Sequence, residues 1–377
     1  MSDAAEGASV ALICNSTWYA WNFRANTIRA LRKRGCAVTV IAPPDASVAN
    51  ISTINGVSYL PWRLSMDGSG PFREGASLVA LVRHLRRIRP ALVFSFTIKP
   101  NIYAGLACWL LRIPYAPNVT GLGMVVGSAG FSGRLLAKLY AITCSCSVRL
   151  FVQNANDLEV LREFGLSESV EVVRLNGSGV DLAHFSFRPM PSGGSFVFVF
   201  IGRLQEDKGI REFVEAAHQL HMNDSAVRFV VVGGTEHTNA SGLTAAELDT
   251  WRSKGVVDFI GTQEDIRPWL WKANVLVLPS HGGEGVPRAI LEAASTGRPA
   301  IVSDVPGCRD AVIDRETGFV VPARNPSALV EAMSAAAGSV DRIAEMGRNA
   351  RRLAEARFSE ESVINEYLDC LEHVRVT

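Results

Sequence analysis

Two cations stand directly after a predicted strand in the second half of the chain, where a bound phosphate would meet them. An apolar strand expected at residues 196–201 ends in Gly202-Arg203, and Lys208 lies just before the next expected helix. Glycine lets a phosphate approach the backbone, and two cations five residues apart at a helix N-terminus suit a diphosphate. We therefore predict that Gly202, Arg203 and Lys208 bind a diphosphate group. The alternative is a pair of solvated surface charges.

Two glutamates follow a later strand and suit the binding of hydroxyl groups. Glu284 lies in a loop between Gly282-Gly283 and Gly285, and Glu292 lies eight residues further on, in the helix that this loop opens. Eight residues are just over two helical turns, so we expect the two acids to face the same side. A carboxylate beside a phosphate site is explained if it holds hydroxyls, which sugars and riboses supply. A capped, solvated helix is the alternative, and it leaves the glycines around Glu284 unexplained.

These loops need a scaffold, and the chain alternates strands with helices in two successive stretches. In the first half we expect strands at residues 10–14, 37–42, 91–96, 148–153 and 170–175, with helices at 22–34, 78–89, 103–111 and 155–164. In the second half we expect strands at 196–201, 227–232, 257–260, 275–278, 300–302 and 318–321, with helices at 209–221, 266–272, 288–296, 326–337, 340–357 and 360–374. This alternation is typical of an α/β fold with parallel sheets covered on both faces.

Proline and glycine cluster at residues 185–195, and this cluster predicts a linker between two domains. We expect two doubly wound, Rossmann-like domains that face a central cleft, with boundaries at 1–188 and 189–358. Ligands of such sheets lie at the carboxyl ends of the strands. A third loop in such a position, residues 303–309, is expected to be either a ligand loop or an ordinary strand-to-helix turn.

Charge is distributed unevenly, although the formal net charge of the 377 residues is only +1. Residues 1–150 carry 16 Lys/Arg against 5 Asp/Glu, a balance of +11, whereas residues 151–377 carry 22 against 32, a balance of −10. The basic half is therefore the candidate for an anionic partner. With 48% hydrophobic and 20% charged residues, the chain can bury a sizeable core, which excludes a disordered protein.

The seven cysteines and the apolar runs indicate a cytoplasmic protein. No C-x-x-C occurs, which excludes a zinc ribbon or a thioredoxin-type site, so we expect free, buried thiols in a reducing compartment. The polar N-terminus, residues 1–8, does not have the pattern of a signal peptide. The apolar runs are shorter than the ~18–20 residues of a membrane-spanning helix. The protein could still lie on a membrane surface.

Taken together, Gly202-Arg203, Lys208-Gly209, Glu284 and Glu292 resemble the E-x7-E signature of retaining glycosyltransferases of family 4, and the resemblance extends over nearly the whole chain. It implies the GT-B fold and a nucleotide-sugar donor. It further implies that Arg203 and Lys208 bind the donor diphosphate, that Glu284 holds the donor sugar with backbone amides nearby, and that Glu292 binds the ribose. The implied catalytic residues are Glu284, Arg203 and Lys208.

The resemblance also defines the rest of the donor site and the path of the last helix. The nucleotide base is implied to lie near Gly233-Gly234 and Gly261-Thr262. The last helix, residues 359–377, is implied to cross back to the N-terminal domain, so that 1–188 binds the acceptor and 189–358 the donor. The complete set of donor-binding residues is then Gly202, Arg203, Lys208, Gly233, Thr262, Glu284, Gly285, Val286, Pro287, Arg288 and Glu292.

Two segments of the first half narrow the resemblance. Residues 95–103 and 119–123 are similar to enzymes that extend undecaprenyl-diphosphate-linked sugars, such as the bacillosaminyl-lipid N-acetylgalactosaminyltransferases. This likeness implies a polyprenyl-diphosphate-saccharide acceptor, with Lys99 either meeting its diphosphate or serving as a surface lysine. The other implied acceptor-binding residues are Asn118, Thr120 and Gly121. Many family members have a histidine after this strand, but this chain has Thr97 and Lys99, so no general base is assigned.

The chain contains no D-x-D sequence, which usually supplies the metal bridge to a nucleotide diphosphate. We therefore expect transfer without a metal or another cofactor, with Arg203, Lys208 and helix N-termini neutralising the leaving group. Retention of the anomeric configuration follows from the resemblance, and we expect front-face attack. A double displacement would need a nucleophilic carboxylate, for which Glu284 is the formal candidate. Closure of the two domains is expected, with hinges at 189–194 and near Phe358.

Two basic, amphipathic segments of the first half suit an anionic lipid surface. Residues 78–89 and 131–140 interleave arginine and lysine with apolar side chains. We expect the protein on the inner face of the cytoplasmic membrane; ordinary core-packed helices with solvated arginines are the alternative.

Other functions remain open at this point. They are a nucleotide-sugar epimerase of similar architecture and an inactive nucleotide-sugar-binding protein. Nucleic acid is not expected as a partner, because no recognised motif or aromatic platform accompanies the basic residues. The donor sugar is expected to be UDP-linked N-acetylhexosamine or hexose, and the sequence specifies neither the linkage nor the oligomeric state.

Overall fold

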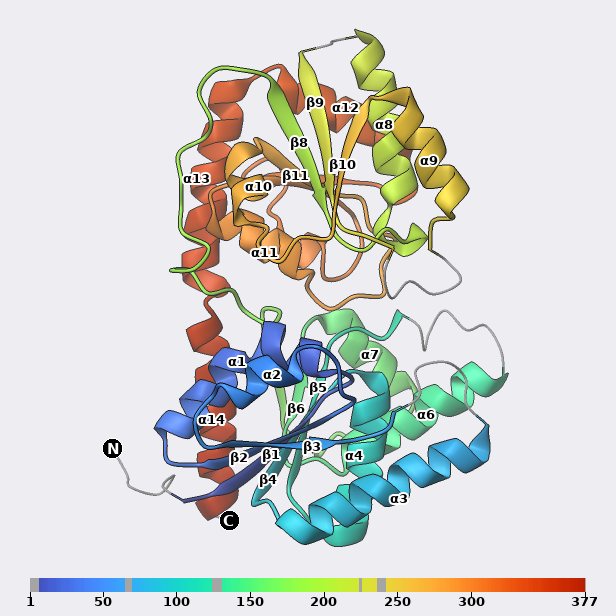
Figure 1. The fold of residues 1–377 in the computed structure, drawn as a ribbon, viewed down its shortest axis with the longest axis vertical. Helices are drawn as coiled ribbons and strands as arrows, with labels where there is room; N and C mark the ends of the chain where they lie inside the picture. The colour runs from blue at the N-terminus through green and yellow to red at the C-terminus, as the bar shows by residue number, and fades with distance from the viewer. Residues whose placement is uncertain (1–6, 65–69, 124–130, 224–225, 236–241, 377) are drawn as a thin grey trace. The chain divides into compact units, whose positions relative to one another are not determined.

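The computed structural model describes residues 7–64, 70–123, 131–223, 226–235 and 242–376. It divides into two compact units, one of Met1–Leu175 with Ser362–Thr377 and one of Asn176–Glu361 (Figure 1). We call these unit 1 and unit 2. No helix in the described part of the chain is long and apolar enough to cross a bilayer.

Unit 1 contains a seven-stranded parallel sheet with the order β3-β2-β1-β4-β5-β6-β7. The central strands are buried on both faces, which is why they read as continuous apolar runs. The order reverses between β1 and β4, so this is where a doubly wound sheet opens for a ligand. The strands are β1 (Ser9–Ile13), β2 (Ala37–Ala42), β3 (Val57–Pro61), β4 (Leu92–Phe96), β5 (Tyr115–Val119), β6 (Leu150–Val152) and β7 (Val172–Arg174).

Helices cover both faces of this sheet. One face packs against α1 and α14, and the other against α3, α4, α6 and α7. The helices of unit 1 are α1 (Thr17–Lys33), α2 (Val48–Ser52), α3 (Pro71–Ile88), α4 (Ile98–Leu111), α6 (Phe131–Ser145), α7 (Ala155–Glu163) and α14 (Glu360–Val376).

Unit 2 contains a six-stranded parallel sheet with the order β10-β9-β8-β11-β12-β13, which reverses between β8 and β11. Its strands are β8 (Phe196–Ile201), β9 (Val227–Val232), β10 (Val257–Gly261), β11 (Val275–Leu278), β12 (Ala300–Ser303) and β13 (Gly318–Val321). Its helices are α8 (Ile210–Asn223), α9 (Ala245–Lys254), α10 (Arg267–Lys272), α11 (Arg288–Ser295), α12 (Pro326–Ala337) and α13 (Val340–Arg357), with short 3-10 turns at Glu206–Lys208 and Arg309–Ala311.

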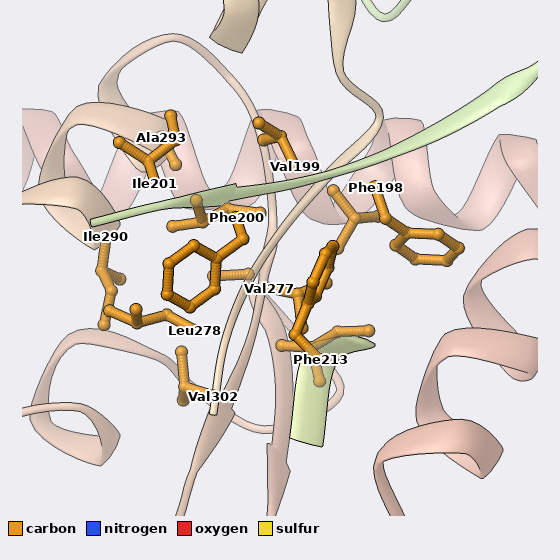
Figure 2. Packing of buried hydrophobic residues seen from close by; sticks show 14 of the residues in the cluster. Phe198, Val199, Phe200, Ile201, Phe213, Val277, Leu278, Ile290, Ala293 and Val302 are labelled. Carbon is orange, nitrogen blue, oxygen red and sulfur yellow. The ribbon is translucent and has the colours of Figure 1, made fainter. Parts of the chain in front are cut away.

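One hydrophobic cluster holds unit 2 together. Phe198 and Phe200 of β8 lie beside Phe213 of α8 (Figure 2). Phe198 also stacks on Phe229 of β9, with 5.9 Å between the ring centroids. Ile290 of α11 packs in the same cluster. Because α8 and α11 each begin at the carboxyl edge of the sheet, this core fixes the loops in which the predicted donor-site residues lie.

The expected α/β class with two doubly wound parallel sheets is confirmed. The expected linker, however, does not separate the units. The buried Arg298 side chain donates hydrogen bonds to the carbonyls of Arg188 (2.7 Å) and Pro189 (3.3 Å), which ties this part of the chain to unit 2. The division falls at Leu175, before the expected boundary at 188, and the chain returns to unit 1 at Ser362. Val180 and Ser359 form a parallel bridge within unit 2, beside both crossings.

Candidate functional site

Three neighbouring strands of unit 2 end in glycines whose backbones are in direct contact. The N–H of Gly202 donates to Val232 O (3.1 Å), and the N–H of Gly233 donates to Gly261 O (3.0 Å). Gly233 has φ +150°, and a Cβ placed on it would overlap the carbonyl of Gly202. Only glycine fits this position, so the carboxyl edge of β8, β9 and β10 exposes backbone rather than side chains. An exposed backbone edge of this kind suits the predicted approach of a phosphate at Gly202 and of the nucleotide base near Gly233 and Gly261.

Lys208 lies at the end of the 3-10 turn between β8 and α8 and is buried, with 7% of its surface exposed. Its ammonium forms an ion pair with Asp207 (3.2 Å) and a second with the carboxylate of Glu284. Burial lowers the pKa of this ammonium, an effect that exceeds the opposing attraction of Asp207, and the nearby charge of Arg203 lowers the pKa further. A buried cation with two carboxylate partners can exchange one of them for a phosphate oxygen.

The Lys208 turn and the Glu284 loop are held against each other. The carbonyl of Asp207 accepts hydrogen bonds from Ser280 Oγ and from the N–H of His281, both at 2.8 Å. A Cβ on Gly209, which has φ +74°, would overlap the carbonyl of Pro279. The two predicted binding segments, far apart in the sequence, are thus one continuous structure.

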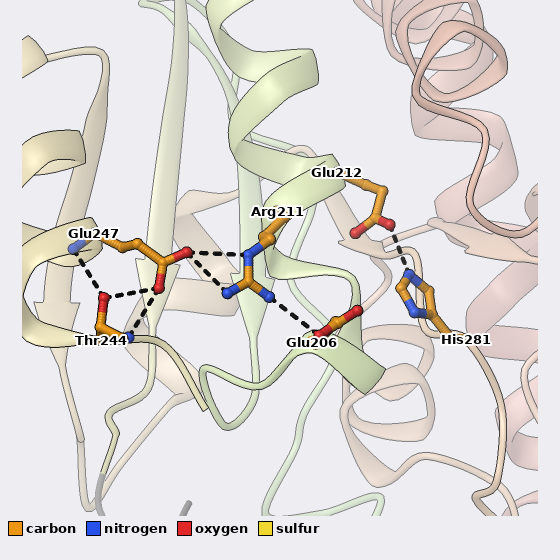
Figure 3. Close-up of polar contacts among 6 residues, drawn as sticks. All are labelled: Glu206, Arg211, Glu212, Thr244, Glu247 and His281. Carbon is orange, nitrogen blue, oxygen red and sulfur yellow. Dashed lines mark hydrogen bonds and ion pairs between the residues drawn. The ribbon is translucent and has the colours of Figure 1, made fainter. Parts of the chain in front are cut away.

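A histidine–glutamate pair strengthens this junction, and sequence reasoning missed it. His281 Nε2 lies 2.7 Å from Glu212 Oε1, and both side chains are largely buried (Figure 3). Glu212 is in the first turn of α8, so the pair connects α8 to the Glu284 loop. No spacing rule joins residues 212 and 281; the available signal was a histidine within a glycine-rich loop.

A second polar network joins α8 to α9. Arg211 donates to Glu247 Oε1 (2.8 Å) and to Glu206 (3.4 Å), and Glu247 forms a capping box with Thr244 at the start of α9 (Figure 3). These hydrogen bonds lower the pKa of Glu247 to about 2, with the backbone N–H of Thr244 as the largest cause. The network supports the helix that carries Glu212.

Glu292 lies in α11 and is buried, with its carboxylate bonded to Arg288 Nε at 2.7 Å. Burial raises the pKa of Glu292, and the Arg288 guanidinium opposes that rise. That Glu284 and Glu292 face the same side stays a prediction, and helical periodicity does not support it. The helix begins at Arg288, so Glu284 lies in the preceding loop and no helical periodicity relates the two acids.

Tight packing also fixes the loop from Glu284 to the start of α11. A Cβ on Gly307, which has φ +81°, would overlap the carbonyl of Gly285. Gly285, Val286 and Pro287 are buried, and Pro287 caps α11. The segment 303–309 therefore contacts the Glu284 loop, whereas Asp304 and Arg309 form an exposed ion pair (2.9 Å).

The remaining donor-site predictions lie at the surface of unit 2. Arg203 is exposed directly after β8, on the same edge as Lys208. Thr262 is exposed directly after β10. Both positions are open to a ligand, and their binding roles stay predictions. Among the residues that the structure describes, no three His, Cys, Asp or Glu side chains gather as metal ligands would.

The predicted acceptor residues lie at the carboxyl edge of the sheet in unit 1, at the ends of β4 and β5. Lys99 is half-buried in the first turn of α4 and forms an ion pair with Glu74 (3.0 Å). Asn118 is fully buried in β5, where its amide donates to the Tyr367 hydroxyl. Thr120 is half-buried, and Gly121 is buried with φ +123°. Asn118 thus faces α14, whereas Lys99, Thr120 and Gly121 lie just beyond the ends of β4 and β5.

Comparisons with known proteins agree with this architecture. Residues 195–338 match the family described as "Glycosyl transferases group 1", and residues 20–177 match "Glycosyl transferase 4-like domain". The chain is 27% identical over 371 residues to the N,N'-diacetylbacillosaminyl-diphospho-undecaprenol alpha-1,3-N-acetylgalactosaminyltransferase of Campylobacter jejuni, which covers 94% of this chain and 96% of that protein. It is 30% identical over 279 residues to the UDP-Gal:alpha-D-GlcNAc-diphosphoundecaprenol alpha-1,3-galactosyltransferase of Escherichia coli, covering 69% and 70%.

The fold is similar to that of solved structures of low sequence identity. HepE of Anabaena in complex with UDP-glucose superimposes with a TM-score of 0.79 at 15% identity, covering 97% of this chain and 100% of that one. The sucrose-phosphate synthase of Thermosynechococcus elongatus gives 0.78 at 19% identity, covering 97% and 99%.

Two doubly wound sheets, with a buried lysine and two glutamates at the carboxyl edge of the second, define the GT-B class of glycosyltransferases. Within that class, the chain belongs to glycosyltransferase family 4. The expected fold, family and enzyme class are confirmed, and the epimerase alternative is not supported.

Proposed function

We propose that this enzyme transfers a sugar, with retention of configuration and without a metal, from a UDP-sugar to a polyprenyl-diphosphate-linked saccharide. The observation that carries the proposal is the buried junction of Lys208 with Glu284, close to Glu212 and His281, at the carboxyl edge of the second sheet. The names of the Campylobacter and Escherichia relatives support the acceptor class, and the latter relative and the UDP-glucose complex of HepE support the donor class.

The proposed chemistry assigns a task to each group at this edge. Lys208 and Arg203 neutralise the donor diphosphate, Glu284 accepts hydrogen bonds from sugar hydroxyls, and Glu292 accepts them from the ribose. The bond between the anomeric carbon and the β-phosphate oxygen breaks, and UDP leaves. The acceptor hydroxyl oxygen bonds to the same face of that carbon, and its proton passes to a β-phosphate oxygen. Glu284 acts as a hydroxyl ligand here rather than as a nucleophile.

We further propose that α3, α4 and α6 of unit 1 rest on the anionic inner face of the cytoplasmic membrane. Residues 71–149 carry ten Lys/Arg and a single acid, Glu74, which is paired with Lys99. The helices also expose large apolar side chains, among them Trp109 (68%) and Leu135 (59%). Arginine together with exposed tryptophan and leucine suits an interface of phosphate headgroups and acyl chains. Such a surface would bring the enzyme to a lipid-linked acceptor.

The decisive test is nucleotide release from a panel of UDP- and GDP-sugars in the presence of EDTA, with and without a polyprenyl-diphosphate-saccharide. We expect acceptor-dependent release of UDP from one donor. We expect that release to fall sharply in Lys208→Met and Glu292→Ala but not in Lys254→Met or Glu331→Ala, which change exposed residues of the same unit. NMR of the product should show the donor's anomeric configuration. Donor binding with no release from any pair would favour an inactive binding protein, and loss of activity in EDTA would overturn the metal-independent mechanism.

A further inference from the structure

Unit 1 buries a guanidinium that forms no ion pair with any residue that the structure describes. Arg24 lies in the middle of α1 with 1% of its surface exposed. Its Nη2 donates to the Tyr19 hydroxyl (3.1 Å), whereas its Nε and Nη1 are buried and make no hydrogen bond. The ion pairs among the described residues do not include Arg24. Guanidinium nitrogens buried in this way are costly, because five N–H donors and a full charge have left water.

The neighbours of Arg24 in the described part of the chain are aromatic rings and a thiol. Its Cζ lies 4.2 Å from the ring centroid of Phe96 and 5.7 Å from those of Tyr19 and Tyr367. Burial raises the pKa of Tyr367 and that of Cys14 to about 12, so neither supplies a negative charge at neutral pH. Cation–π contacts stabilise a desolvated cation by less than the cost of taking it out of water. Among the residues that the structure describes, the groups around Arg24 therefore offset only part of this cost.

The position of Arg24 in the fold is that of a ligand site. Cys14 directly follows β1, and Phe96 is the last residue of β4. These two strands flank the point at which the order of the sheet reverses, and ligands of doubly wound sheets bind there, beyond the carboxyl ends of the strands.

Further unsatisfied polar atoms belong to residues that follow these two strands and to one residue of the neighbouring β5. Asn15 Oδ1, Thr97 Oγ1 and Asn118 Oδ1 are each buried without a hydrogen bond. Thr97, directly before α4, has φ +72°, a conformation that is a genuine outlier for a β-branched residue; such strained residues cluster at active sites and ligand clamps. Its backbone opens α4 without a side-chain cap and with no acidic residue in the first turn. Asn15, Tyr19 and Thr97 are half-buried, so the edge of this cluster reaches solvent.

We propose that Arg24 and Thr97, with the N-terminus of α4, form a binding site for phosphate oxygens at the switch point of unit 1. The proposal rests on the proposed function in one respect, since we assign the phosphate to the diphosphate of the lipid-linked acceptor. The guanidinium supplies the charge, the Thr97 hydroxyl and the positive end of the α4 dipole add to it, and Asn15 and Asn118 accept from hydroxyls of the attached sugar.

The test compares acceptor and donor kinetics in the full-length enzyme. We expect Arg24→Met to raise the KM for a short-chain polyprenyl-diphosphate-saccharide about tenfold or more, the effect of losing one charged hydrogen bond, and to leave the donor KM unchanged. Arg24→Lys should recover part of the loss. Arg29→Met is the matched control, because Arg29 is an exposed arginine of the same helix. A polyprenyl-monophosphate-saccharide should bind more weakly to the wild type and lose less in Arg24→Met.

A second variant covers the case in which Arg24→Met does not fold. Thr97→Gly suits φ +72° without strain, so it should keep the melting temperature while raising the acceptor KM. Calorimetry of inorganic diphosphate binding and, separately, of UDP binding distinguishes this site from the donor site. The affinity for inorganic diphosphate should fall in Arg24→Met and in Thr97→Gly, while the affinity for UDP stays constant. Unchanged acceptor KM and unchanged diphosphate affinity in Arg24→Lys and Thr97→Gly would overturn the proposal. Absence of transfer by the wild type would instead overturn the proposed function, and diphosphate binding would still decide the role of Arg24.

Discussion

Lys208 shows how burial and neighbouring charge set the chemistry of a single residue. Its ammonium is desolvated, yet it lies between the carboxylates of Asp207 and Glu284. Desolvation has the larger effect, so the proton is held less tightly than in an exposed lysine. In the folded protein, the charge of Lys208 therefore changes with pH at values where an exposed lysine is still fully protonated.

We predict that the alkaline limb of the pH profile for kcat/KM reports Lys208. The rate should fall at a pH below the ordinary lysine pKa of about 10.4, because the neutral amine no longer holds the diphosphate. The sign for stability is opposite: between the lowered pKa and the ordinary value, the unfolded chain binds more protons, so the contribution of Lys208 to stability grows as pH rises. Lys208→Arg should move the alkaline limb upward, and Lys254→Arg should not. An unmoved limb in Lys208→Arg would assign it to another group.

At the scale of elements, glycine-mediated contacts between backbones fix the site. Gly233 lies against Gly202, Gly209 against Pro279, and Gly307 against Gly285. Each contact joins two loops from different strands, so the carboxyl edge of β8, β9, β11 and β12 behaves as one rigid surface. A side chain at any of these positions would separate two loops rather than fill a cavity.

Gly233→Ala tests this contact. We expect a loss of about 1–3 kcal/mol of stability from overpacking, and weaker UDP binding, because the carbonyl of Gly202 must move. Gly193→Ala is the control: Gly193 also has positive φ (+84°), but a Cβ there meets nothing within 4 Å. Chemical denaturation and UDP titration of both variants check this expectation. Equal losses of stability and of UDP affinity in Gly233→Ala and Gly193→Ala would contradict it.

The His281–Glu212 pair is the side-chain counterpart of these contacts. Glu212→Ala leaves His281 Nε2 buried without its partner, which should cost about 1–3 kcal/mol and raise the donor KM severalfold by loosening the Glu284 loop. Glu215→Ala removes an exposed glutamate from the same helix and should do neither. A donor KM that stays at the wild-type value in Glu212→Ala would show that the loop is held without this pair.

At the scale of the whole molecule, the asymmetry of charge belongs to the helices of unit 1 that cover one face of its sheet. Basic residues there are spread over α3, α4 and α6, and the compensating acids of the chain lie elsewhere. A distribution of this kind would favour the approach of unit 1 to an anionic surface, as proposed above, without changing the net charge.

We expect binding to phosphatidylglycerol vesicles that weakens with salt and is absent for phosphatidylcholine vesicles. Replacing Arg86 and Arg87 of α3 with glutamine should weaken binding roughly 25-fold, at about 1 kcal/mol for each charge. Replacing Arg342 and Arg348, exposed arginines of α13 in unit 2, should have little effect. Equal losses in the two double variants, measured by vesicle sedimentation, would argue against a membrane surface on unit 1.

Sequence patterns predicted most elements but missed those whose composition is atypical. β5 contains Pro117 and Asn118, which are rare in a central strand, and it exists because β4 and β6 pair with it on either side. Helix α3 begins at Pro71 rather than near residue 78, since its first turn is largely exposed and gives no apolar signal. The segment at 185–195 has the composition of a linker, but Arg298 binds its carbonyls from a distant position in the chain.

The sequence by itself determined the fold class, because local periodicity shows the alternation of strands and helices, and the family, through its resemblance at short motifs; the roles of the donor-site residues stay predictions. Only the tertiary structure brought Lys208 to Glu284 and His281 to Glu212, and only it buried Arg24 among aromatic rings from α1, β4 and α14. The physical reason is that such contacts join residues far apart in the sequence. Their burial, and with it their charge state and their need for a partner, is set by how sheets and helices pack.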